Sequence, residues 1–98
     1  MERNIDELLK KCEQILTKEL PVLRKINGIT QKDLGDIIGV SRQTITNIES
    51  GKSEMKWCHF LAIMFIFSFD YESSEYLKKL DIPYEELKQW LIDMKGER

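Results

Sequence analysis

The segment of residues 31–52, QKDLGDIIGVSRQTITNIESGK, constrains the fold most strongly. Its apolar residues recur at the spacing of two short amphipathic helices: Leu34, Ile37, Ile38, Val40, Ile45 and Ile48. Gly39 can take the positive φ that a sharp turn between helices needs, and Ser41 is an expected N-cap for the second helix. Gly35 lies where the two helices must nearly touch. The pattern therefore predicts a helix, a tight turn, and a second helix held firmly against the first.

The second helix of this unit spans residues 41–50 and is expected to bury Ile45 and Ile48. Its outer face carries four polar side chains: Arg42, Gln43, Thr46 and Asn47. Guanidinium, amide and hydroxyl groups on a rigid helix match the hydrogen-bonding groups that base edges present in the DNA major groove. We therefore predict that this face contacts double-stranded DNA.

The net charge of −2 argues against a nucleic-acid ligand only when the chain is taken as a whole. Residues 24–56 carry six basic and four acidic side chains, whereas residues 57–98 carry five basic and eight acidic ones. Phosphate binding depends on the local field more than on total charge. The asymmetry fits a DNA-facing centre and an acidic C-terminal part turned away from the DNA.

The N-terminal part of the chain predicts two helices. Residues 4–19 place apolar side chains along one stripe of an amphipathic helix. Pro21 is expected to end that helix, because proline inside a helix removes a hydrogen bond and clashes with the preceding turn. A new helix is then expected over residues 20–26, with proline in its first turn. Thr30 is the expected N-cap of the next one.

The C-terminal half predicts helices as well. A helix is expected to restart at Ser53 and to run through residues 57–67, which are apolar nearly all round. Such a helix must be covered on more than one face, by the C-terminal segment or by a second subunit. Residues 73–80 and a segment through residues 87–94 predict two last helices. Six or seven helices without a strand make an all-α fold.

No catalytic, metal or cofactor site is expected. Cys12 and Cys58 are isolated thiols without ligand partners at metal-binding spacing, which favours a reducing cytoplasm over a disulfide framework. His59 is the only histidine, and no residue near it has the spacing of a catalytic relay. The most apolar run, residues 60–69, is shorter than the roughly 20 residues that cross a bilayer. We therefore predict a non-enzymatic cytoplasmic protein without cofactors and without a membrane partner.

The two-helix unit resembles the helix-turn-helix of the lambda repressor/Cro class, the XRE family of regulators. The matching residues are Gln31, Gly39, Val40, Ser41, Ile45, Ile48, Glu49 and Lys52. The resemblance implies an all-α, lambda repressor-like five-helix DNA-binding domain over residues 20–68. Residues 1–19 would then add an N-terminal helix, and residues 69–98 a C-terminal helical extension for dimerisation or for a partner. One departure is Gly35, where the family usually has alanine.

The resemblance also implies roles for individual side chains. The base-reading positions are Arg42, Gln43, Thr46 and Asn47. The phosphate-contacting positions are Gln31, Ser41, Thr44, Ser50 and Lys52. Arg24 and Glu49 occupy positions that pair in this family and lock an early helix onto the second helix of the unit.

These features together predict sequence-specific binding of double-stranded DNA by a transcriptional regulator of repressor type, acting as a homodimer. Two alternatives remain open. The chain could be the antitoxin of a toxin–antitoxin pair, with its C-terminal helices around a protein partner. It could also be a protein-interaction module that uses the same fold without touching DNA.

Overall fold

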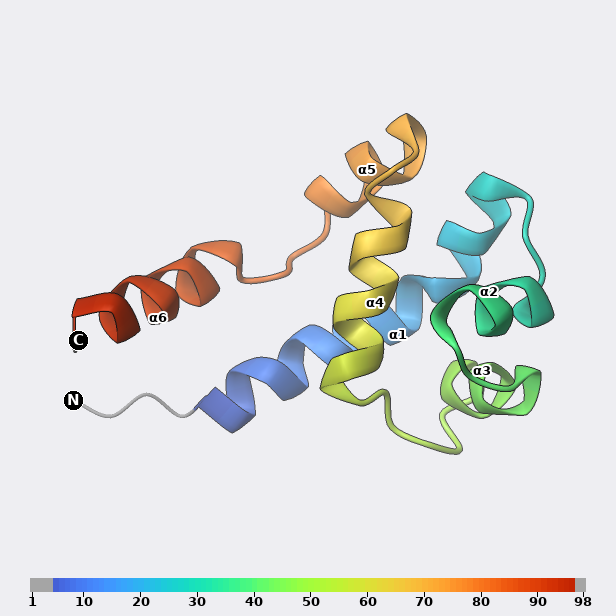
Figure 1. Ribbon diagram of the computed structural model, residues 1–98, viewed down its shortest axis with the longest axis horizontal. Coiled ribbons are helices and arrows are strands. Elements are labelled where there is room, and N and C mark those ends of the chain that lie inside the picture. The colour runs from blue at the N-terminus through green and yellow to red at the C-terminus, as the bar shows by residue number, and fades with distance from the viewer. Residues whose placement is uncertain (1–4, 97–98) are drawn as a thin grey trace.

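The computed structural model describes residues 5–96, and within them the chain forms six α-helices and no strand. In chain order these are α1 (Ile5–Asn27), α2 (Gln31–Ile38), α3 (Arg42–Glu49), α4 (Trp57–Phe67), α5 (Tyr71–Lys78) and α6 (Tyr84–Gly96). Figure 1 shows α4 crossing α1, with α2 and α3 gathered at one end of the molecule and α6 at the other. The all-α prediction is confirmed. The outermost residues of the two expected extensions, 1–4 and 97–98, lie outside the described residues.

Helix α1 runs without interruption through Pro21, so the predicted break there is wrong. An internal proline costs about 3 kcal/mol in a helix. Burial of nearby side chains offsets this cost, because Leu16, Leu20 and Leu23 are fully buried. Each buried leucine stabilises the fold by roughly 1.5–3 kcal/mol. Pro21 itself is exposed. The helix therefore crosses the expected boundary between residues 19 and 20, and both of its halves supply core residues.

The core lies where α1 meets the helices that pack on it. Its buried apolar residues come from the whole described chain up to the start of α6: Cys12, Leu16, Leu20, Leu23, Leu34, Ile45, Ile48, Met55, Phe60, Ile63, Phe67, Leu77 and Ile82. Helix α1 contacts α3, α4 and α5, and α2 contacts α3 and α4. The third helix is thus held from two sides, by α1 beneath it and by α2 beside it.

The starts of α4 and α5 differ from the prediction. Helix α4 begins at Trp57 and not at Ser53, because residues 52–53 form a bend and residues 54–56 are irregular, with Met55 buried among them. Helix α5 begins at Tyr71 and not at residue 73, because Asp70 acts as its N-cap. The Asp70 Oδ2 accepts a hydrogen bond from the backbone N–H of Ser73 at 3.1 Å.

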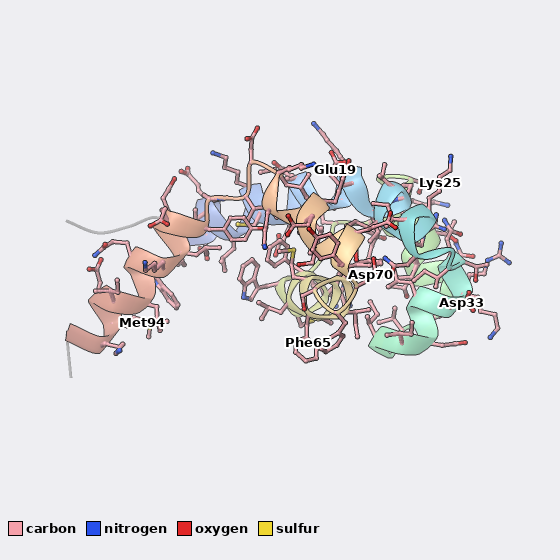
Figure 2. The ribbon with its side chains drawn as sticks, turned by 90° about the horizontal axis from the view of Figure 1, so that it is seen from above. Glu19, Lys25, Asp33, Phe65, Asp70 and Met94 are labelled. Atoms are coloured by element: carbon pink, nitrogen blue, oxygen red, sulfur yellow. The ribbon has the colours of Figure 1, made fainter. Side chains whose placement is uncertain are left out.

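Helix α6 has no fully buried residue and extends away from the other helices (Figure 1). The N-terminal end of α6 is held in place, because Ile82 just before it is buried and the Tyr84 hydroxyl donates to the Leu77 carbonyl at 3.0 Å. Figure 2 shows Met94 far from the body of the molecule and Phe65 directed away from α1. Across residues 5–96, no helix combines the length and the apolar character needed to span a membrane.

Candidate nucleic-acid interface

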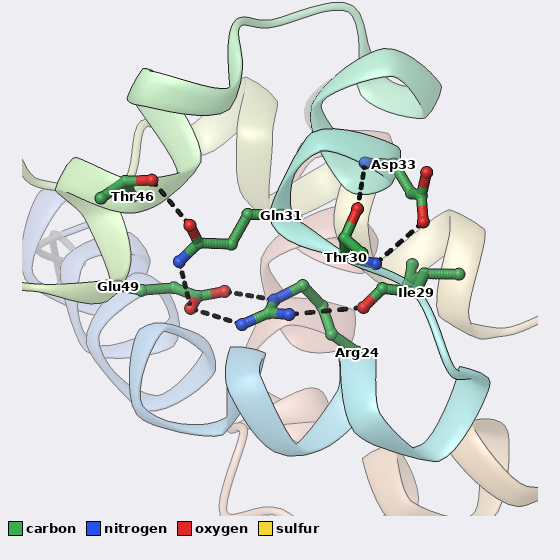
Figure 3. A network of polar contacts seen from close by, with 7 residues as sticks. All are labelled: Arg24, Ile29, Thr30, Gln31, Asp33, Thr46 and Glu49. Carbon is green, nitrogen blue, oxygen red and sulfur yellow. Dashed lines mark hydrogen bonds and ion pairs between the residues drawn. The ribbon is translucent and has the colours of Figure 1, made fainter.

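Helix α2 begins at a reciprocal cap. The Thr30 hydroxyl accepts from the backbone N–H of Asp33 at 3.0 Å, and the Asp33 carboxylate accepts from the backbone N–H of Thr30 at 2.9 Å (Figure 3). The same backbone hydrogen bond from Thr30 lowers the pKa of Asp33. The cap prediction at Thr30 is confirmed, and it fixes where Gln31 begins the helix.

The turn after α2 brings the two helices into close contact. Gly39 has a φ of 82°, as the sequence predicts, and the backbone N–H of Val40 donates to the Gly35 carbonyl at 2.8 Å. A Cβ atom on Gly35 would lie only 2.7 Å from the Val40 carbonyl oxygen. Gly35 therefore does more than keep the helices close: alanine at this position requires the turn backbone to move.

Ser41 is the N-cap of helix α3, and its hydroxyl oxygen accepts from the backbone N–H of Thr44 at 3.1 Å. The hydroxyls of Ser41 and Thr44 also lie 2.9 Å apart, so these two expected phosphate contacts are hydrogen-bonded to each other. At the other end the Ser50 hydroxyl donates to the Asn47 carbonyl at 3.2 Å. Lys52 follows the helix and is exposed.

The outer face of α3 carries three of the expected base-reading residues. Arg42 and Gln43 are exposed, and Asn47 is partly buried. The Gln43 Nε2 donates to the Asn47 Oδ1 at 2.9 Å, one turn along the same helix. Arg42 makes no side-chain hydrogen bond or ion pair with any residue in the range 5–96. The face therefore offers one unengaged guanidinium and two amides that bond only to each other.

Arg24 and Glu49 meet between α1 and α3. The Arg24 Nε and Nη2 donate to the two Glu49 carboxylate oxygens at 2.6 and 2.8 Å, while the Arg24 Nη1 donates to the Ile29 carbonyl at 3.3 Å. Their side chains are only 18% and 8% exposed, and the hydrogen bonds from Arg24 to Glu49 raise the pKa of Arg24. Such a bidentate pair fixes the orientation of both side chains.

Gln31 and Thr46 extend this pair into a network that sequence reasoning did not anticipate (Figure 3). The Gln31 Nε2 donates to the Glu49 Oε1 at 3.0 Å, and the Thr46 hydroxyl donates to the Gln31 Oε1 at 2.7 Å. One expected phosphate contact and one expected base reader are thus bonded to each other. Residue spacing within single helices carries no signal for such a contact, because it depends on how α2 and α3 pack.

A surface hollow lies beside this network. It is lined by Arg24, Ile29, Thr30, Gln31, Lys32 and Arg42. The Lys32 ammonium is held by the Asp36 carboxylate at 2.8 Å on the exposed side of α2. The Arg42 guanidinium is therefore the unpaired cation at the rim of the hollow within the described part of the chain.

Comparison with protein families matches residues 22–54 to the family described as helix-turn-helix. The match covers the end of α1, all of α2 and α3, and the turn that follows. This segment is thus a helix-turn-helix of the lambda repressor/Cro type, and the resemblance stated from the sequence is confirmed for it. The described helices fit a lambda repressor-like domain with additional helices. Searches among curated proteins and among solved structures returned no match.

A helix-turn-helix is a DNA-binding unit, in which the second helix enters the major groove. The segment of residues 22–54 is therefore of a DNA-binding type.

Proposed function

We propose that this protein is a transcriptional regulator of repressor type that binds double-stranded DNA sequence-specifically and reads the major groove with residues 41–50. The observation that carries the proposal is the outer face of α3. Its polar side chains lie on a helix held by the core through Ile45 and Ile48 and tied to α1 through Glu49. A rigid base-reading face loses little conformational entropy on binding.

Arg42, Gln43 and Asn47 are the proposed base readers. A guanidinium can donate two hydrogen bonds to guanine O6 and N7, and an amide can pair with adenine N6 and N7. The Gln43–Asn47 hydrogen bond lies on an exposed surface, so either amide can exchange it for a base at small cost. Each good bidentate pair contributes about 1–3 kcal/mol of discrimination against a wrong base.

The proposed phosphate contacts are Gln31, Ser41, Thr44, Ser50 and Lys52. They lie at the N-terminal ends of α2 and α3 and just beyond the C-terminal end of α3. Contacts at these places position the recognition helix in the groove without reading sequence. The backbone N–H groups at helix N-termini add to the attraction for phosphate.

We further propose that the protein acts as a homodimer in the cytoplasm. Two recognition helices about 34 Å apart would read successive major grooves of a near-palindromic site. The surface available for dimerisation includes Leu61 and Phe65 on α4, Phe69 after it, and the exposed apolar residues of α6. Occupying the site would by itself exclude other proteins from that stretch of DNA, which is sufficient for repression.

A second candidate is supported by α6 alone. Trp90, Leu91, Ile92 and Met94 are all at least 36% exposed, and such a helix favours a protein partner. In an antitoxin, residues 69–98 would bind the toxin while α3 binds DNA. In a protein-interaction module, α3 would have no DNA-binding role. A stable hetero-complex on co-purification supports the antitoxin, whereas a homodimer alone supports the regulator.

The direct test compares DNA binding by Arg42→Ala and Gln43→Ala with binding by Lys88→Ala, an exposed charge on α6. We expect the first two variants to relax the preference at one or two base pairs each and the third to leave both affinity and preference unchanged. Unchanged preference in all three variants would exclude α3 as the reading helix and favour the interaction module.

A further inference from the structure

We propose that Thr46 is a positioning residue that orients the Gln31 amide toward a DNA phosphate and does not read a base. The inference rests on the proposed function, because it specifies how the DNA interface is built. The observation behind it is that Thr46, Gln31 and Glu49 form one chain of hydrogen bonds from α3 to α2 and back.

The direction of this chain follows from the chemistry of its members. Both Glu49 oxygens accept from Arg24, and an ionised carboxylate has no proton to donate. The Gln31 group that faces Glu49 must therefore be its NH₂ and not its carbonyl. The Gln31 carbonyl oxygen is then turned to Thr46, whose hydroxyl has to donate. Reversing the amide would place two acceptors together, the Gln31 carbonyl and the Glu49 carboxylate.

Within the Thr46–Gln31 pair, this arrangement assigns every polar side-chain proton but one. The single Thr46 hydroxyl proton is used on Gln31, so Thr46 has none left for an acceptor on a base. One Gln31 N–H is used on Glu49, and the other N–H has no partner among the described residues. Gln31 also lines the hollow that Arg42 borders. The remaining N–H is thus the donor that Gln31 can offer to a phosphate.

Thr46 differs in this respect from its neighbours on α3. The Gln43–Asn47 hydrogen bond stays within one helix and can be exchanged for a base without disturbing α2. Without the hydrogen bond from Thr46, the Gln31 carbonyl has no partner, and only the hydrogen bond to Glu49 still orients the amide. The residue is partly buried between the two helices, as a positioning role requires.

The test uses the full chain and two variants of the same residue. Thr46→Val keeps the shape of the side chain and removes the hydroxyl, while Thr46→Ser keeps the hydroxyl. Affinity is measured on a selected duplex site and on its single-base-pair variants. We expect Thr46→Val to weaken binding to all of these duplexes by one common factor, about three- to tenfold, as for one lost hydrogen bond. Thr46→Ser should restore the affinity.

A second measurement locates the phosphate. Each phosphate of the site is replaced in turn by a neutral methylphosphonate, and the loss of affinity is measured with wild type, Thr46→Val and Gln31→Leu. At one phosphate in each half-site, the replacement should weaken binding by the wild type more than binding by either variant. Both variants have already lost the contact to that phosphate. The chosen control is Lys52→Ala, which should couple to a different phosphate.

Three results overturn the inference. A changed preference at any base pair in Thr46→Val would make Thr46 a base reader, and unchanged affinity would deny it any role in binding. If every phosphate replacement weakens binding by the wild type and by Thr46→Val to the same extent, Thr46 does not act through a phosphate contact of Gln31. If the wild type prefers no DNA sequence at all, the proposed function fails and this inference fails with it. If the wild type does select a DNA sequence and any of the first three results is found, the inference about Thr46 fails while the proposed function stands.

Discussion

Arg24 in α1 and Glu49 at the end of α3 are joined by two side-by-side hydrogen bonds, of 2.6 Å from Nε and 2.8 Å from Nη2. The pair links residues 25 positions apart in the chain and holds α3 at its C-terminal end. A third bond from Arg24, to the Ile29 carbonyl, ties the loop before α2 to the same guanidinium. The placement of α3 therefore depends on a charged pair as well as on buried isoleucines.

Removing one partner of this pair should destabilise the protein. Arg24→Met leaves the Glu49 carboxylate largely buried without its counter-charge, and we expect the free energy of unfolding to fall by about 3 kcal/mol. Urea unfolding followed by circular dichroism measures it. In the double variant Arg24→Met with Glu49→Met, the free energy of unfolding should fall by less than the sum of the decreases in the two single variants. Simple additivity would mean that the pair contributes no coupling energy.

Gly35 should not tolerate the alanine that is usual in the family. A Cβ atom would lie 2.7 Å from the Val40 carbonyl oxygen. We expect Gly35→Ala to destabilise the protein by about 1–2 kcal/mol, since the overlap outweighs the roughly 1 kcal/mol gained in helix propensity. Gly96→Ala on α6 is the control, because nothing lies within 4 Å of its added Cβ. Increased thermal stability in Gly35→Ala would show that the turn adapts at no cost.

His59 should make stability fall on mild acidification. Its Nδ1 is buried without a hydrogen-bond partner in the described chain, and burial, followed by the nearby Lys56, lowers its pKa from 6.5. Protons therefore bind the unfolded state first as the pH falls below 6.5, and stability is lost in that direction. The urea midpoint should drop more for wild type than for His59→Gln between about pH 7 and about pH 5. Parallel curves would show that His59 titrates equally in both states.

The helix-turn-helix itself could be predicted from local signals. Thr30, Gly39 and Ser41 act where their own backbone needs a cap or a positive φ, so residue type and position are sufficient to place them. The buried faces of α2 and α3 follow from apolar spacing, except that Ile37 is 49% exposed. Local chemistry therefore predicts local structure well in this segment.

Features that depend on packing could not be predicted. Pro21 was expected to end a helix because its local cost is large, and the burial of Leu20 and Leu23 on either side overrides that cost. The bond between Thr46 and Gln31 joins two helices, so no spacing within either helix could indicate it. The start of α4 depends in the same way on the buried position of Met55.

Ionic strength should affect DNA binding strongly. Each phosphate neutralised by a basic side chain contributes about 0.9 to the slope of log affinity against log salt concentration. Lys52→Ala should reduce that slope by about 1 and weaken binding about equally on all sequences. Lys95→Ala on α6 serves as the control and should leave the slope unchanged. A wild-type affinity independent of salt would contradict the phosphate contacts.

In vitro selection from random duplex DNA tests the central claim most directly. Purified wild-type protein and the Gln43→Ala variant are carried through selection side by side, and the enriched sequences are compared. We predict a pseudo-palindromic site with half-sites about one helical turn apart, in which the variant changes the preference at the same place in each half-site. Failure of the wild type to enrich any sequence at low salt would contradict the account.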